Sequence, residues 1–292
     1  MNGLTVTDVR VLPGDSGFLL DDGKTSILFD TSFAFTGYRM ADKVKDLLGE
    51  RKLDYIFLSH SHYDHVVGAP YVLRYYPEAT VVAGEYAAKI FAKPTARAIM
   101  RDLDHKYAET CGVTEYEDLI DELKVDITVN DGDSITCGDM SFTVISLPGH
   151  TKDSIAFYLK EKKLLLGSET LGVYFGEDTY LPFFLVGYQM SLDSFEKVKA
   201  MDIEYMLLPH YGVVDQAETK RFLKNAEWTF RDTAEKIVEI FRTGGTAEDA
   251  LEYYTERFYR ENVKPTYPVN AFHLNTTIMI ELIKKELLDK SY

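Results

Sequence analysis

Residues 57–70 read FLSHSHYDHVVGAP, and they place three of the chain's seven histidines and an aspartate within six positions. The cluster consists of His60, His62, Asp64 and His65, and it follows the apolar run YIFL, which is typical of a buried strand. Residues two apart on a strand project to the same side, so we expect His60, His62 and Asp64 to lie together, with His65 at the turn into a helix. Histidine and aspartate are metal ligands, and this spacing offers ligands for two neighbouring ions rather than one.

Three further candidate ligands also follow strand-like apolar runs. His150 stands in SLPGHTKDS, His210 stands in YMLLPHYG, and Glu169 comes just after KLLLGS. Functional residues concentrate in loops at the ends of strands. We therefore expect these three side chains to belong to the same site as the first cluster.

The rest of the chain alternates strand-like and helical patterns. A hairpin is predicted around the turn Asp21–Lys24, since an Asp-Gly pair separates two apolar runs. Helices are predicted at 40–50, 70–77, within 84–124, at 191–201 with Ser191 as cap, and through most of 217–292, where Thr246 and Asp249 form a capping box. Strands are predicted at 55–60 and 79–84, in a second β region from 124 to 169, and at 205–210.

Composition excludes several classes of protein. The net charge is −15, from 32 basic and 47 acidic residues, so a nucleic-acid partner is not expected. The sequence shows neither a leader pattern nor an apolar run long enough for a membrane span, so no membrane partner is expected either. Only Cys111 and Cys137 occur, and they fit reduced thiols in the cytoplasm.

In order and spacing, these segments resemble the metallo-β-lactamase superfamily. His60-Ser-His62-Tyr-Asp64-His65 matches the family's first metal motif, PGH at 148–150 the second histidine, and PHYG at 209–212 the last, with SILFDTS as its early strand. The resemblance implies an α/β (α+β) fold, a four-layered αββα sandwich with a helical C-terminal extension. We expect residues 1–215 to form the catalytic domain and residues 216–292 an extension packed on it.

The resemblance also implies a ligand set. His60, His62 and His150 would bind one metal, Asp64, His65 and His210 the other, and Glu169 would bridge them, with Asp64 also the candidate catalytic residue. The family usually has an aspartate where this chain has Glu169, and glutamate is longer by one methylene. A non-bridging Glu169, or Ser168 in its place, is therefore the alternative.

Two divalent ions about 3.5–4 Å apart can hold a hydroxide that attacks a carbonyl carbon. The expected activity is hydrolysis of a small-molecule thioester or ester. The ligand types favour zinc, with iron or manganese as alternatives. The competing interpretation is a regulatory or sensor protein whose helical tail binds a partner, and a homodimer is left open.

A narrower resemblance, carried by the helical tail and its segment NAFHLNTTIMIEL, links the chain to the quinolone-signal response thioesterase and to glyoxalase II. The aromatic-rich segment after Glu169 would form one wall of the substrate pocket, or else pack in the core. His273 would reach the site from the tail, or else pack on its own helix. The candidate substrate-binding residues are Tyr174, Phe175, Phe183, Phe184, Tyr211 and His273.

Overall fold

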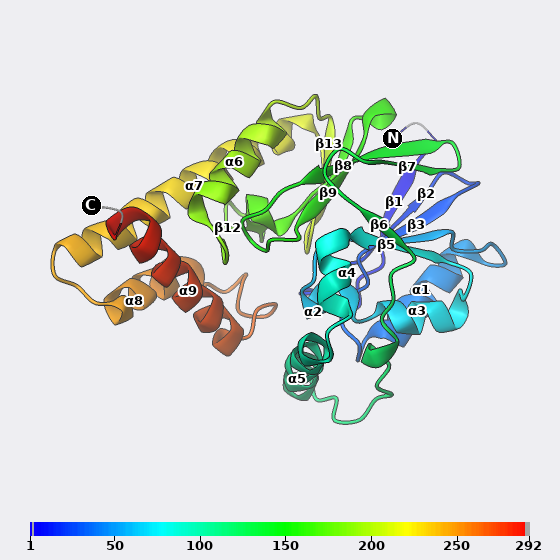
Figure 1. Ribbon diagram of the computed structural model, residues 1–292, viewed down its shortest axis with the longest axis horizontal. Helices are drawn as coiled ribbons and strands as arrows, with labels where there is room; N and C mark the ends of the chain where they lie inside the picture. Colours follow the sequence, from blue (N-terminus) through cyan, green and yellow to red (C-terminus); the bar gives the residue numbers. More distant parts are fainter. Residues whose placement is uncertain (2, 290–292) are drawn as a thin grey trace. The chain divides into compact units, whose positions relative to one another are not determined.

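The computed structural model describes residue 1 and residues 3–289. The chain forms two compact units, and neither is a single continuous stretch. Unit 1 consists of Met1–Ser146 and Ile155–Leu166, and unit 2 of Leu147–Ser154 and Gly167–Tyr292. Each unit is described by itself, with its elements labelled in Figure 1.

The first sheet of unit 1 has the strand order β1-β2-β3-β4-β5-β6. Strands β1 to β3 are antiparallel, which confirms the predicted hairpin at Asp21–Lys24, and β3 to β6 are parallel. The first strand of the second predicted β region is confirmed as β6, and it pairs with β5 and so completes the first sheet. The bounds are β1 Thr5–Asp8, β2 Phe18–Asp21, β3 Ser26–Phe29, β4 Tyr55–Leu58, β5 Thr80–Gly84 and β6 Ile127–Val129.

A second, antiparallel set of strands in unit 1 has the order β10-β9-β8-β7. It packs on the first sheet through phenylalanines: the Phe57 ring lies 4.4 Å from that of Phe157 and 5.3 Å from that of Phe142, centroid to centroid. Burial of these rings stabilises the sandwich through the hydrophobic effect. The bounds are β7 Ser134–Cys137, β8 Met140–Ser146, β9 Ile155–Leu159 and β10 Leu164–Leu166.

Helices cover the other face of the first sheet. Side chains alternate along β4, so Ile56 and Leu58 face helices α1 and α3 while Phe57 faces the second strand set. Helix α1 contributes Met40 and Val44 to this core. The helices of unit 1 are α1 Gly37–Leu48, α2 Tyr63–Val66, α3 Ala69–Tyr75, α4 Glu85–Phe91, α5 Pro94–Thr110, η1 Ile120–Glu122 and η2 Lys160–Lys162.

Unit 2 is mostly helical. Helix α6 begins at Tyr188 with Gly187 as its N-cap, so the prediction that Ser191 caps it was wrong; Ser191 lies inside the first turn and donates to the Gly187 carbonyl. The predicted capping box of Thr246 and Asp249 is confirmed at the start of α8. The elements are η3 Glu169–Leu171, β11 Val173–Tyr174, β12 Tyr180–Leu181, α6 Tyr188–Lys199, β13 Tyr205–Leu208, β14 Gly212–Val214, α7 Gln216–Arg242, α8 Ala247–Phe258, α9 Val269–Ile283 and η4 Lys284–Leu288.

Aromatic side chains form much of the core of unit 2. The ring of Phe183 packs against Tyr254 of α8 and Phe272 of α9, while Phe230 of α7 packs against Phe184 and Phe195. The three C-terminal helices are thereby tied to the segment that follows β12 (Figure 1). Within the described part of the chain, no helix has both the length and the apolar character that crossing a bilayer requires.

Candidate metal centre

The first group of predicted ligands lies just beyond β4, in unit 1. The strand ends at Leu58, and His62 is the N-cap of α2, which carries Asp64 and His65. The expectation that these residues alternate along a strand was therefore wrong, since a loop and a helical turn present them instead. The ring centroids of His60 and His62 nevertheless lie 4.7 Å apart, and those of His60 and His65 lie 4.1 Å apart.

A buried carboxylate orients the ligands of unit 1. Asp30, fully buried at the end of β3, accepts a hydrogen bond of 2.7 Å from Nδ1 of His65. It also accepts hydrogen bonds from the Ser59 backbone, the Ser59 hydroxyl and the Ser16 hydroxyl, at 2.9–3.0 Å. The Ser59 hydroxyl lies 3.0 Å from Nδ1 of His60. Histidines held at Nδ1 in this way present Nε2 to a metal.

The Asp30-Thr31 turn also holds the backbone of α2. The backbone N–H and the hydroxyl of Thr31 both donate to the His65 carbonyl, at 2.7 and 3.1 Å. A Cβ at Gly68 would overlap the Thr31 carbonyl, so the close approach of these two segments requires glycine there. The early strand and the histidine motif therefore form one rigid assembly.

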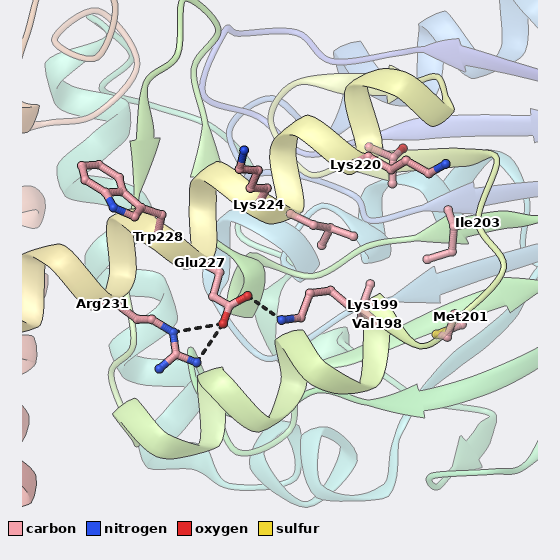
Figure 2. A pocket seen from close by; sticks show the side chains of 11 residues that line it. Val198, Lys199, Met201, Ile203, Lys220, Lys224, Glu227, Trp228 and Arg231 are labelled. Carbon is pink, nitrogen blue, oxygen red and sulfur yellow. Dashed lines mark hydrogen bonds and ion pairs between the residues drawn. The ribbon is translucent and has the colours of Figure 1, made fainter.

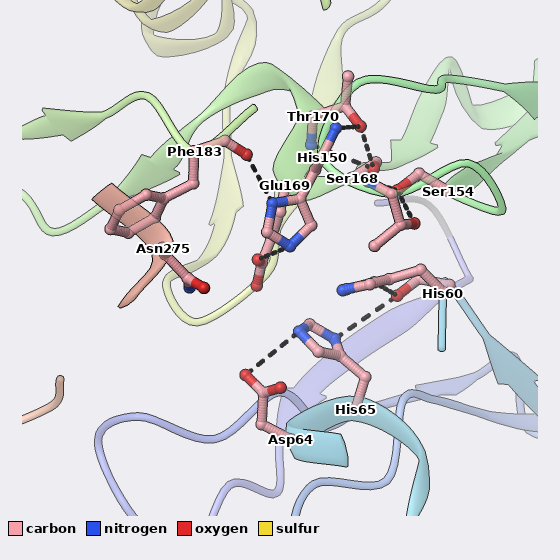
Figure 3. Close-up of polar contacts among 12 residues, drawn as sticks. His60, Asp64, His65, His150, Ser154, Ser168, Glu169, Thr170, Phe183 and Asn275 are labelled. Carbon is pink, nitrogen blue, oxygen red and sulfur yellow. Dashed lines mark hydrogen bonds and ion pairs between the residues drawn. The ribbon is translucent and has the colours of Figure 1, made fainter. Parts of the chain in front are cut away.

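The second group of predicted ligands lies in unit 2, where Glu169 contacts His150 (Figure 3) and also His210. Its Oε2 lies 2.9 Å from Nε2 of His150, and its Oε1 contacts Nε2 of His210. His150 donates from Nδ1 to the Phe183 carbonyl at 2.7 Å, which directs its Nε2 toward Glu169. Glu169 is buried, so a protonated histidine or a cation is needed to balance its charge.

The loop that carries His150 is tightly packed. Gly149 has φ of 147°, a conformation that favours glycine, and a Cβ there would overlap the Ser191 hydroxyl of α6. The Thr170 hydroxyl donates to the Leu147 carbonyl at 2.6 Å and accepts from the His150 backbone. Helix α6 and the turn that carries Glu169 thus fix the same loop.

The residues of each unit fit a metal site. In unit 1, a ligand atom of His60 lies within 4.8 Å of one of His62, and a ligand atom of Asp64 lies within 4.8 Å of one of His65. In unit 2, the carboxylate of Glu169 lies within 4.8 Å of a ring nitrogen of His150 and of one of His210. Imidazole and carboxylate donors suit zinc, iron and manganese. Asp64 Oδ2 lies 3.6 Å from Nε2 of His65, a spacing that suits two donors to one ion (Figure 3).

The predicted substrate-binding residues occupy different environments. Phe183 and Phe184 are fully buried in the aromatic core of unit 2, the position that core packing requires, and Tyr174 is buried against Tyr180 and Phe222. Tyr211 is 40% exposed. The remaining two, Phe175 and His273, are half-buried.

The orienting residues were not identified from the sequence. The motif SILFDTS included Asp30, but nothing in it indicated that the side chain would bind His65. The hydrogen bond from Nδ1 of His150 is accepted by the main-chain oxygen of Phe183, 33 positions away. Every residue has a backbone carbonyl, so the sequence does not reveal which one is the acceptor. The one available signal was the charged Asp30 at the end of an apolar strand, because a buried carboxylate must find hydrogen-bond donors.

Known proteins resemble this chain in sequence and in fold. Residues 9–210 match the model of the family described as the metallo-beta-lactamase superfamily. Over 134 residues the chain is 31% identical to Glyoxylase B2 of Dictyostelium discoideum, covering 45% of this chain and 41% of that protein. Over 148 residues it is 28% identical to hydroxyacylglutathione hydrolase of Francisella tularensis subsp. novicida (strain U112), covering 50% and 46%. The chain thus spans less than half the length of these two relatives.

Among solved structures, a metallo-beta-lactamase family protein of Thermus thermophilus aligns with a TM-score of 0.62 at 17% identity, covering 98% of this chain and 94% of that one. An identity this low shows the fold alone. Together with the family match, it confirms the predicted fold class, including the helices at the C-terminal end.

Proposed function

Because the chain belongs to the metallo-β-lactamase superfamily, we propose that it is a metal-dependent hydrolase that cleaves a small-molecule thioester or ester. The names of two curated relatives, Glyoxylase B2 and hydroxyacylglutathione hydrolase, support a thioester as the substrate. The proposal extends to the whole chain, with residues 1–215 as the catalytic part and residues 216–292 as its helical extension. Both cysteines are unpaired thiols, which suits a reducing compartment such as the cytoplasm.

The proposed ligands form two sets. His60, His62 and His150 serve one divalent ion, Asp64, His65 and His210 serve the other, and Glu169 serves both. Zinc is the first choice, with iron or manganese as alternatives. When bound, such ions lower the pKa of water to about 7 and polarise a carbonyl oxygen, which together supply the chemistry of hydrolysis.

The contacts of Glu169 carry the proposal. One carboxylate oxygen meets His150 and the other meets His210, and these two histidines are assigned to different ions. These two contacts support the proposal that the longer glutamate side chain bridges the two ions from η3. The Phe183 carbonyl orients His150 and the Asp30 carboxylate orients His65, so each set has an orienting partner.

The buried thiol of Cys137 is poorly suited to act as the nucleophile. Burial raises the pKa of the Cys137 thiol to about 12, so it stays protonated at neutral pH. We propose that Asp64 takes part in catalysis as a ligand beside the reacting groups. Tyr211 is the most exposed of the proposed substrate-binding residues, and Tyr174, Phe175, Phe183, Phe184 and His273 complete that set.

The experiment combines metal content with hydrolysis. Protein purified without added metal is analysed for metal content and assayed with a hydroxyacylglutathione and with the oxygen ester of the same acid. We expect two ions per chain and thioester hydrolysis in the wild type, and one ion with strongly reduced turnover in Glu169→Gln, which keeps the size of the side chain and removes its charge. Glu239→Gln, exposed near the end of α7, is the control.

Two results would overturn the proposal. Two ions in Glu169→Gln would exclude the bridge. Hydrolysis of neither substrate by a fully metal-loaded wild type would favour the regulatory or sensor interpretation instead.

A further inference from the structure

A groove between helices α6 and α7 of unit 2 combines positive charge with an exposed aromatic ring (Figure 2). Its cavity measures about 450 Å³, a size typical of sites for small organic molecules. The lining residues are Val198, Lys199, Met201, Ile203, Thr219, Lys220, Leu223, Lys224, Glu227, Trp228 and Arg231.

The charge of this groove is opposite to that of the chain. Its lining carries four basic side chains and one acidic one, in a protein of net charge −15. The one acid is already engaged: Glu227 binds Lys199 at 2.6 Å and Arg231 at 2.8 Å (Figure 2). Lys220 and Lys224 make no ion pair with any residue in the described part of the chain, so their charge is available to an anion.

The buried hydroxyl of Thr219 is a second observation that indicates a ligand. Thr219 is 1% exposed and lines the groove, and its Oγ1 has no hydrogen-bond partner among residues 1 and 3–289. Leaving a buried hydroxyl without a partner costs free energy. A polar ligand atom would remove that cost once the Thr219 side chain rotates to turn its hydroxyl into the groove.

The aromatic end of the groove is held in place. Trp228 is 60% exposed, and the guanidinium of Arg257 on α8 lies 5.8 Å from its ring centroid. Lys220, Lys224 and Trp228 are four residues apart in succession, so they follow one face of α7 over about 12 Å. Apolar side chains of Val198, Met201, Ile203 and Leu223 line the space alongside.

We propose that the α6–α7 groove is a binding site for a small organic anion with an aromatic ring. The anionic group binds Lys220 and Lys224, a polar atom meets the Thr219 hydroxyl, and the ring packs on Trp228 and the apolar lining. This site is separate from the proposed metal ligands, and it does not depend on the hydrolase proposal.

The test uses the fluorescence of Trp228, which is the only tryptophan of the chain. The full-length protein is titrated with adenosine monophosphate and with 2-naphthoate, and in parallel with their neutral counterparts adenosine and 2-naphthamide. We expect at least one anion to change the fluorescence saturably, about tenfold more tightly than its neutral counterpart, because it gains charge-assisted hydrogen bonds. Inorganic phosphate should compete, and higher ionic strength should weaken binding.

Variants localise the binding. Lys220→Ala combined with Lys224→Ala should abolish it, whereas Lys236→Ala, on the same helix but outside the groove, should leave it unchanged. Thr219→Val should weaken binding and Thr219→Ser should retain it. Circular dichroism checks that each variant is folded.

Several outcomes would overturn the proposal. These are the lack of a saturable response to either anion, equal binding of the charged and neutral compounds, and wild-type affinity in the double lysine variant. Binding of an acidic peptide alone would assign the groove to a protein partner instead.

Discussion

Asp30 accepts four hydrogen bonds within unit 1, and the one from His65 links it to the proposed metal ligands. Such a carboxylate fixes the ring orientation of the histidine and raises its basicity as a ligand. Under the proposed ligand set, Asp30 would control how well His65 binds a metal without being a ligand itself.

Asp30→Asn tests this role. We expect metal affinity to fall about 10- to 100-fold, because an amide cannot replace the charge that orients and polarises the His65 ring. Competition with a coloured chelator measures the dissociation constants. Ser16→Ala is the control, since it removes one hydrogen bond to Asp30 without touching His65. Equal affinities in wild type and Asp30→Asn would contradict the prediction.

The seven proposed ligands were recognisable from the sequence because a metal site constrains residue type. Histidine and aspartate at strand ends, in a characteristic order, carry that information directly. The contacts of Glu169 with His150 and His210 were not predictable, since they depend on where η3 begins.

At the scale of elements, helix α5 holds the loop that follows Asp30. Asp104 of this helix is fully buried, accepts a hydrogen bond of 2.8 Å from the Ala34 backbone, and accepts another from the Tyr116 hydroxyl. Burial raises the pKa of Asp104 from 3.8 to about 6, although its hydrogen bonds act in the opposite direction. The carboxyl group therefore changes its charge in a mildly acidic range.

This pKa predicts a specific dependence of stability on pH. The folded state binds the proton more tightly than the unfolded state, so the contribution is fully present below about pH 4 and is lost as the pH rises through about 6. The loss amounts to about 3 kcal/mol in the free energy of unfolding. Urea denaturation at several pH values, compared with Asp104→Asn, measures it.

At low pH, Asp104→Asn should have a smaller free energy of unfolding than the wild type. Its free energy of unfolding should not show the loss that the wild type shows as the pH rises through about 6. The comparison uses the difference between the two curves, because other carboxyl groups titrate in both proteins. Parallel curves for wild type and Asp104→Asn would show that Asp104 does not titrate in this range.

Element prediction succeeded where a local pattern decides the structure and failed where packing does. The hairpin at Asp21–Lys24 and the capping box at Thr246 follow from short-range chemistry. The membership of β6 in the first sheet depends on its parallel pairing with β5, more than 40 residues earlier in the chain. Helix α6 starts before Ser191 because that side chain packs under Gly149 rather than acting as a cap.

At the scale of the whole molecule, the proposed metal ligands are divided between unit 1 and unit 2. A bound ion that contacts only the folded state stabilises it by mass action, by about 2.7 kcal/mol at a free concentration 100 times the dissociation constant. We expect removal of metal with a chelator to lower the melting temperature by roughly 5–10 °C. Differential scanning calorimetry measures this shift and separates the transitions if the units unfold independently.

The control for metal removal is the double variant His62→Ala and His65→Ala. It should melt at a temperature that the chelator does not alter, since it lacks ligands from both proposed sets. An unchanged melting temperature in the chelated wild type would mean that metal binding contributes nothing to folding stability.

The His150 loop, residues 147–154, belongs to unit 2 although chain segments of unit 1 flank it on both sides. On the ribosome this loop emerges before the rest of its own unit, and its partner carbonyl on Phe183 follows 33 residues later. At ordinary rates of synthesis that delay is roughly two to seven seconds. During this interval the nascent chain already carries the four candidate ligands of unit 1 and His150 itself, so a metal ion that arrives early meets a His150 whose ring is not yet oriented by its carbonyl partner.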